Sequence, residues 1–137
     1  MLGRHVFYSS KVGCAKCHSM DGRGGTLGPG LAGVARSKSR SQIIDAILDP
    51  SAEFPPQYQA WIVLTTDGTI HRGLQLDHKA GGAIQLTLES GQGRYFKAEE
   101  IEAYRAMPTS LMPTGLENQM DLSEFRDLVA YLCSPDQ

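Results

Sequence analysis

A pair of cysteines followed at once by a histidine lies near the beginning of the sequence and limits what this chain can be. Residues 14–18 read Cys-Ala-Lys-Cys-His. Two thiols at this spacing lie on one helical turn, where each can form a thioether with one vinyl group of a porphyrin. The next residue, His18, is then placed under the iron, and imidazole is a good iron ligand. The motif predicts one covalently attached haem c per chain, held at Cys14 and Cys17 with His18 as an axial ligand.

Other uses of paired cysteines fit this chain less well. A zinc site needs four ligands, commonly two pairs of Cys or His. The remaining candidates, His5, His71, His78 and Cys133, form no paired motif. A thioredoxin-like dithiol would follow a strand in a βαβ unit, and no such pattern precedes residue 14. The chain has three cysteines, and an odd number argues against a disulfide framework.

Two segments carry start signals for helices. Ser39 can cap a helix that runs to Leu48, because Gln42 follows three residues later and apolar residues recur at helical spacing. Asp121 and Glu124 form a similar capping pair before a helix over 122–133. We expect the buried side of this last helix to consist of Leu122, Phe125, Leu128, Val129 and Leu132. A short amphipathic segment with Gly3, Val6 and Phe7 precedes the cysteine motif, and Gly3 is expected to contact Tyr131.

The middle of the chain has a different pattern. Apolar residues alternate from Tyr58 to Thr65, and Asp67-Gly68 marks a tight hairpin. Further turn signals separate three or four strand-like runs up to about residue 104. The glycine-rich stretch 21–25 is instead expected to be a loop. We therefore predict a small antiparallel sheet or barrel over 57–104, inserted into a haem domain made of residues 1–56 and 105–137.

Length and charge exclude several classes of protein. The chain has 137 residues and a net charge of -2, with no basic stripe for nucleic-acid binding. No run of 18 apolar residues is present, so no membrane span is expected. The motif lies so near residue 1 that a targeting segment has no room before it. Because haem attachment of this kind follows export, we expect a processed product or a piece of a longer exported protein, located in the periplasm or otherwise outside the cytoplasm.

The chain resembles small c-type cytochromes at Gly28-Pro29-Gly30-Leu31. The resemblance implies that the Pro29 carbonyl orients His18 and that Leu31 packs on the haem. The order of motifs is similar to a haem-binding domain family found near the C-terminus of large exported proteins with a propeller-type, dehydrogenase-like domain. The stretches that carry this likeness are 14–18, 28–31, Ile47-Leu48-Asp49-Pro50-Ser51, Asp67-Gly68-Thr69 with Gly73-Leu74, Ser110-Leu111-Met112-Pro113-Thr114-Gly115-Leu116, and Asp127-Leu128-Val129-Ala130-Tyr131-Leu132.

The second axial ligand is expected to be a methionine, because a thioether suits haem iron. Met112 has the better spacing and context, and the family likeness also supports it. Met107, which also precedes a proline, is the next candidate. His71, His78 or an open position remain as alternatives. Met120 is better explained as an apolar residue that packs against Phe125 at the start of the last helix.

These expectations combine into one hypothesis. The fold would be mainly α, of the class I cytochrome c type, with an inserted β-sheet and α+β overall. The protein would transfer electrons with His18 and Met112 as axial ligands, and would exchange them with redox partner proteins or a fused dehydrogenase-like domain. A haem-based gas sensor and a docking module that uses the β insert, including a homodimer, are the alternatives. No Ser-His-Asp or paired-carboxylate arrangement indicates an enzyme.

Overall fold

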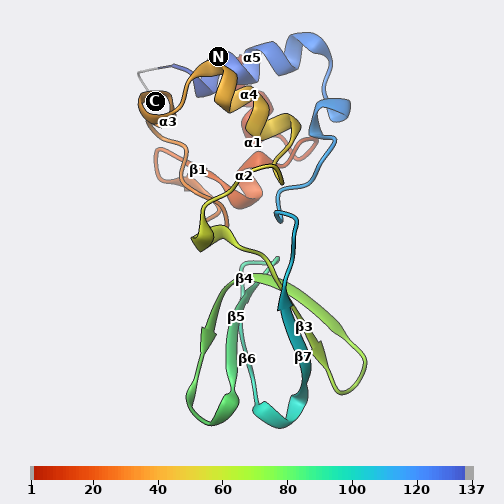
Figure 1. Cartoon of the computed structure of the whole chain (residues 1–137). Helices are drawn as coiled ribbons and strands as arrows, with labels where there is room; N and C mark the ends of the chain where they lie inside the picture. Colours follow the sequence, from red (N-terminus) through yellow and green to blue (C-terminus); the bar gives the residue numbers. More distant parts are fainter. Residues whose placement is uncertain (1, 135–137) are drawn as a thin grey trace. The chain divides into compact units, whose positions relative to one another are not determined.

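The structure is a computed structural model that describes residues 2–134; Met1 and the last three residues of the predicted 105–137 segment lie outside the described part. The chain divides into two compact units (Figure 1). The first contains the described residues within Met1–Ala52 and Met112–Gln137, and the second is Glu53–Leu111. Each unit has its own hydrophobic core.

The first unit is mainly helical. Its elements are α1 (Leu2–Tyr8), α2 (Cys14–Cys17), the short strands β1 (Ser19–Met20) and β2 (Arg23–Gly24), α3 (Val34–Ser37), α4 (Arg40–Leu48), the 3-10 helix η4 (Leu116–Gln119) and α5 (Leu122–Leu132). The predicted loop over 21–25 is therefore wrong in part. Asp21 and Gly22 both have positive φ, which is the geometry of a two-residue hairpin turn, so the glycine-rich stretch pairs β2 with β1.

Both predicted helix starts are confirmed. Ser39 and Gln42 exchange side-chain hydrogen bonds with each other's backbone at the start of α4, and Asp121 and Glu124 do the same for α5. Each box satisfies two of the N–H groups that a helix start leaves without partners. The predicted burial of Leu122 is wrong, because this residue is 84% exposed. Leu122 lies seven residues before the buried Val129 on the same stripe, so its exposure reflects its place at the very start of α5 and not the face it occupies.

The terminal helices cross at close range. Gly3 is buried on α1, and a Cβ placed there would lie 2.6 Å from Tyr131 Cβ on α5. No larger residue fits at this distance without separating the helices, which confirms the predicted contact between these two residues. The crossing places Phe7, which is fully buried, among the core side chains of α5.

The second unit is a five-stranded antiparallel sheet with strand order β6-β5-β4-β3-β7. Its strands are β3 (Trp61–Thr65), β4 (Ile70–His78), β5 (Ile84–Leu88), β6 (Gly93–Phe96) and β7 (Ile101–Ala106), with 3-10 turns η1 (Pro56–Tyr58), η2 (Ala80–Gly82) and η3 (Ala98–Glu100). The last strand pairs with the first, β3. The predicted alternation from Tyr58 starts too early, because a proline at the first position of η1 favours a helical turn there.

One face of this sheet forms the core of the second unit. Val63, Leu86 and Phe96 are fully buried, and Trp61, Leu76, Leu88 and Ile101 pack against them. Thr65 is the buried polar residue of β3, and its hydroxyl donates a 2.6 Å hydrogen bond to Asp67 Oδ1 in the following turn. This bond, together with one from the Thr69 backbone, holds the pKa of Asp67 down to about 2. The turn at 66–69 is therefore fixed by its own side chains.

The expectation of a mainly α cytochrome c fold is wrong. Within the described residues the chain is α+β, with five α-helices, a five-stranded antiparallel sheet and a two-stranded sheet. The physical reason is that the strand-forming segment is long enough to bury its own apolar side chains. The sheet is thus a compact unit with a core and not a decoration of a helical domain.

Candidate functional site

The two cysteines of the 14–18 motif lie on the single turn of α2. Gly13 begins the turn with a left-handed backbone (φ 81°), a conformation that glycine adopts without strain. His18 ends it, with an extended backbone whose N–H donates to Cys14 O at 2.9 Å. The chain therefore leaves the helix at His18, and the imidazole is directed by the following loop rather than by helical geometry.

The loop that contains Pro29 holds the imidazole. His18 Nδ1 lies 2.8 Å from the Pro29 carbonyl oxygen. A carbonyl only accepts hydrogen bonds, so Nδ1 must carry the proton, and the lone pair of a neutral ring is then on Nε2. Gly28 lies against the same ring, since a Cβ at this position would come within 2.7 Å of His18 Cε1. The backbone N–H of Gly28 also donates to Cys17 O at 2.8 Å, which ties this loop to α2.

The ionisation of the site suits metal ligation by His18. Burial lowers the pKa of His18, against the opposing effect of its hydrogen bond to Pro29. The ring is therefore neutral at pH 7, which is the form that binds a metal. Burial is also the main cause that raises the pKa of Cys14 to about 11, and Cys17 adds to it against a backbone hydrogen bond. Cys14 is thus a protonated thiol at neutral pH and not an activated nucleophile.

An apolar cavity of about 40 Å³ lies beside these residues within the first unit. Its lining comes from both ends of the chain and comprises Phe7, Val12, Cys14, His18, Leu31, Ile47, Met112, Leu116, Leu128 and Leu132. Carbon and sulfur atoms form nearly all of the lining, so a bound group would meet few polar partners besides the imidazole.

The structure brings together four of the residues predicted for the site. Cys14, His18, Leu31 and Met112 line the cavity, while Cys17 and Pro29 belong to the turn and the loop that hold His18. Met107 is in the second unit, where its backbone N–H donates to Ala60 O at 2.8 Å. These positions leave the assignment of ligands a prediction.

Sequence reasoning missed some of the lining residues. Val12 is buried immediately before α2, and Leu116 begins η4 after the methionine loop. Neither belongs to a periodic pattern, so only the three-dimensional path of the loops reveals them. Leu128 and Leu132 carry a signal, because they lie four residues apart on the apolar stripe of α5.

The second unit contains another cluster of polar side chains. Thr65 Oγ1 lies 3.3 Å from His71 Nε2, and His71 contacts the edge of the Phe96 ring. Because the Thr65 hydroxyl already donates to Asp67, it can only accept from His71. Between residues 2 and 134, no three or more His, Cys, Asp or Glu side chains are grouped closely enough to hold a metal ion. The four protein ligands of a zinc site are not gathered in this part of the chain.

Comparison with known proteins corrects the family assignment. No family model matches the chain. No curated protein matches it either. The resemblance to c-type cytochromes and to the haem-binding domains of propeller-containing proteins is therefore wrong as an assignment, since no family match supports it and the five-stranded sheet is not part of a mainly α cytochrome fold. Short motifs carried that likeness, and they do not establish a family over the whole chain.

In the described residues, no helix has both the length and the apolar character needed to cross a bilayer.

Proposed function

We propose that this chain holds one haem c at Cys14 and Cys17, with His18 and Met112 as axial ligands, and acts as an electron-transfer protein or domain. The observation that carries the proposal is the position of His18. Its Nδ1 is engaged by the Pro29 carbonyl at 2.8 Å, while its ring lines an apolar cavity together with Cys14 and Met112. When bound, haem supplies a one-electron iron couple whose potential depends on its axial ligands and burial.

The lining of the cavity suits a largely apolar group. Leu31, Ile47 and Leu128 come from a loop, α4 and α5, and present only hydrocarbon to the space. Such a lining excludes water and lowers the local dielectric, which strengthens electrostatic effects on a bound group. The Pro29 carbonyl fixes the tautomer of His18. It also makes the lone pair on Nε2 more basic, so that Nε2 is a stronger metal ligand.

The cysteines support the proposal through their chemistry. The Cys14 thiol is largely buried and stays protonated at neutral pH, so this cysteine is not the stabilised thiolate that a dithiol oxidoreductase uses as its nucleophile. Two sulfurs on one helical turn beside the cavity are suited to hold a group covalently. Mass spectrometry of chain matured in an exporting host should show the added mass of one haem, and Cys14→Ser/Cys17→Ser should abolish it. An unmodified polypeptide would contradict the proposal.

The axial methionine is tested by a matched pair of variants. Met112→Ala should remove the weak long-wavelength methionine–iron charge-transfer band of the oxidised protein, and Met107→Ala should leave it unchanged. Met107 is the suitable control because it belongs to the sheet unit. Loss of the band in both variants, or in neither, would contradict ligation by Met112. Carbon monoxide binding to the reduced wild type would indicate an open position and favour a gas sensor instead.

Location and partners follow from the same proposal. Covalent haem attachment takes place after export, so we place the protein in the periplasm or another exported compartment. We assign it no enzymatic activity of its own, and expect it to exchange electrons with a redox partner protein. The chain should contain haem when it is expressed with an export signal and lack it when it is expressed without one. Equal haem content in both would contradict this location.

A further inference from the structure

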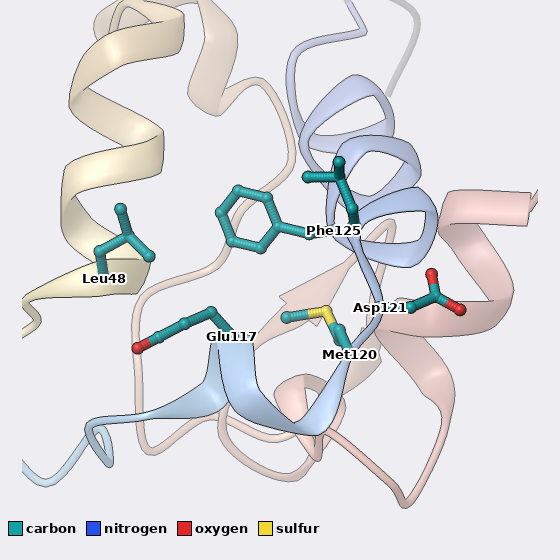
Figure 2. Close-up of a pocket in the computed structure, with 6 residues that line it drawn as sticks. Leu48, Glu117, Met120, Asp121 and Phe125 are labelled. Carbon is teal, nitrogen blue, oxygen red and sulfur yellow. The ribbon is translucent and has the colours of Figure 1, made fainter.

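A groove on the first unit, between α4 and α5, has an apolar floor and an acidic edge. Leu48 from the end of α4 lies across this space from Phe125 on α5, with Met120 below them (Figure 2). The groove has a volume of about 290 Å³. It is lined by Leu48, Glu117, Met120, Asp121, Leu122 and Phe125. Leu48 is 43% exposed and Leu122 84% exposed, so apolar surface faces solvent here. We call this surface the α4–α5 groove.

One carboxylate oxygen in the groove lacks a hydrogen-bond donor. Glu117 Oε2 is shielded from solvent and accepts no hydrogen bond from any described residue. A buried carboxylate oxygen without a donor is costly, and a cation that enters the groove would relieve this cost. Arg126 is the one basic residue between 112 and 134, and it pairs with Asp127. None of the six groove residues is basic, and Lys11 is already paired with Glu124 of α5. The groove thus presents hydrocarbon and negative charge to a partner.

A surface of the second unit has the opposite charge. On β3 the side chains of Val63 and Thr65 are buried, so Ile62 and Leu64 face the other side of the sheet. Ile62 lies between Arg72 of β4 and Arg105 of β7, its partners in the register. Both arginines are exposed, and neither forms an ion pair with a described residue.

The next row of the same surface is apolar. Leu64 lies between Ile70 of β4 and Ala103 of β7, and Ile70 is 60% exposed. Cross-strand neighbours on one face lie close enough to form a continuous surface. We call this surface, made of Ile62, Leu64, Ile70, Arg72, Ala103 and Arg105, the arginine-flanked face. It offers an apolar ridge with two guanidinium groups, which match the apolar floor and the acidic edge of the α4–α5 groove.

From this complementarity we propose that the arginine-flanked face of one copy docks into the α4–α5 groove of a second copy of the same chain. Burial of Ile70 and Leu122 would supply hydrophobic stabilisation, and an arginine would satisfy Glu117. The two surfaces are different, so the contact is heterologous: one copy keeps a free groove and the other keeps a free face. Such contacts build rings or open chains of copies rather than a closed two-fold dimer. Docking of this kind does not require bound haem.

The experiment uses the full chain and two interface variants. The face variant is Arg72→Glu/Arg105→Glu, and the groove variant is Leu122→Lys, which places a cation against the arginines of the partner. All three altered side chains are exposed, so these changes should preserve the fold. Sedimentation equilibrium over a concentration series should show self-association of the wild type. Each variant alone should raise the dissociation constant at least tenfold, about 1.4 kcal/mol.

Mixing the two variants gives the decisive result. The face variant retains an intact groove, and the groove variant retains an intact face, so one contact can form between them. The mixture should yield a dimer with one copy of each variant that grows no further, because the other two surfaces are altered. A symmetric dimer through either surface would not give this pattern. Added salt should weaken the dimer by screening the arginines and Glu117.

Matched controls exclude general effects of charge. Arg36→Glu/Arg40→Glu changes the net charge equally on exposed residues that belong to neither surface, and Leu2→Lys changes another exposed leucine. Both should associate as the wild type does. If a variant loses its circular dichroism, Ile70→Lys replaces the face variant and Glu117→Gln the groove variant. A wild type that stays monomeric, assembly that either variant retains, or a mixture that fails to dimerise would each overturn the proposal.

Discussion

Replacing Gly28 with alanine tests how the His18 ring is held. A Cβ at position 28 would lie 2.7 Å from His18 Cε1 and 2.9 Å from Nδ1, and ordinary contact begins at 3.4 Å. The backbone of Gly28 is tied to Cys17 O by a 2.8 Å hydrogen bond, so the loop cannot retreat without losing it. The imidazole must therefore move by about 0.7 Å to relieve the contact.

The expected cost follows from the hydrogen bond between His18 and Pro29. A ring shift of that size lengthens the 2.8 Å bond to a distance at which it is largely lost. The loss costs about 0.5–1.5 kcal/mol of stability, and the strain of the new methyl group adds to it. Groups that orient a metal-bound histidine typically contribute about 10–100-fold to metal affinity. We therefore expect weaker axial ligation by His18 in Gly28→Ala.

Two readouts separate this effect from a general disturbance of the loop. Nitrogen NMR of the His18 side chain reports the hydrogen bond at Nδ1 in the chain without cofactor, and the midpoint potential reports it in the haem-loaded protein. Gly30→Ala is the matched control. A Cβ at position 30 would meet only the rotatable hydroxyl of Ser19, at 3.2 Å. If Gly28→Ala gives the same NMR shifts and potential as Gly30→Ala, the reasoning about His18 is refuted.

Three further predictions concern stability. Gly3→Ala should destabilise the chain by about 1–2 kcal/mol in urea unfolding despite the better helix propensity of alanine, because its Cβ would lie 2.6 Å from Tyr131 Cβ; a stabilised variant would contradict close crossing of α1 and α5. Ser39→Ala should cost about 0.5–2 kcal/mol by removing the cap of α4, and Ser39→Asp should restore most of it. The lowered pKa of Asp67 means that its contribution is present above its ordinary value of 3.8 and is lost as pH falls towards 2. Asp67→Asn should therefore flatten the decline of the thermal midpoint below pH 4, and an unchanged slope would contradict the bond from Thr65.

Local signals in the sequence determined the parts of the fold that depend on short-range chemistry. The capping pairs at Ser39 and Asp121 identified the starts of α4 and α5, because the groups that satisfy a helix end lie within three residues of it. Asp67-Gly68 identified a hairpin for the same reason, since turn conformation is set by the residues in the turn. Gly3 was recognised as a contact with Tyr131 because only glycine allows such a close approach.

Long-range features required the tertiary structure. The apolar periodicity of α5 placed Leu122 in the core, yet this residue is 84% exposed, because periodicity does not say where the neighbouring elements end. The pairing of β7 with β3 joins strands far apart in the sequence, and its register shifts between Leu64 and Thr65.

Local sequence alone placed Cys14 and Cys17 on one helical turn with His18 next in the chain, because backbone geometry fixes such short spacings. Only the tertiary structure decided that Met112 and Leu128 line the same cavity as His18, while Met107 belongs to the sheet unit. The reason is physical: contacts within one turn follow from backbone geometry, whereas contacts between distant segments depend on how whole elements bury their apolar surfaces.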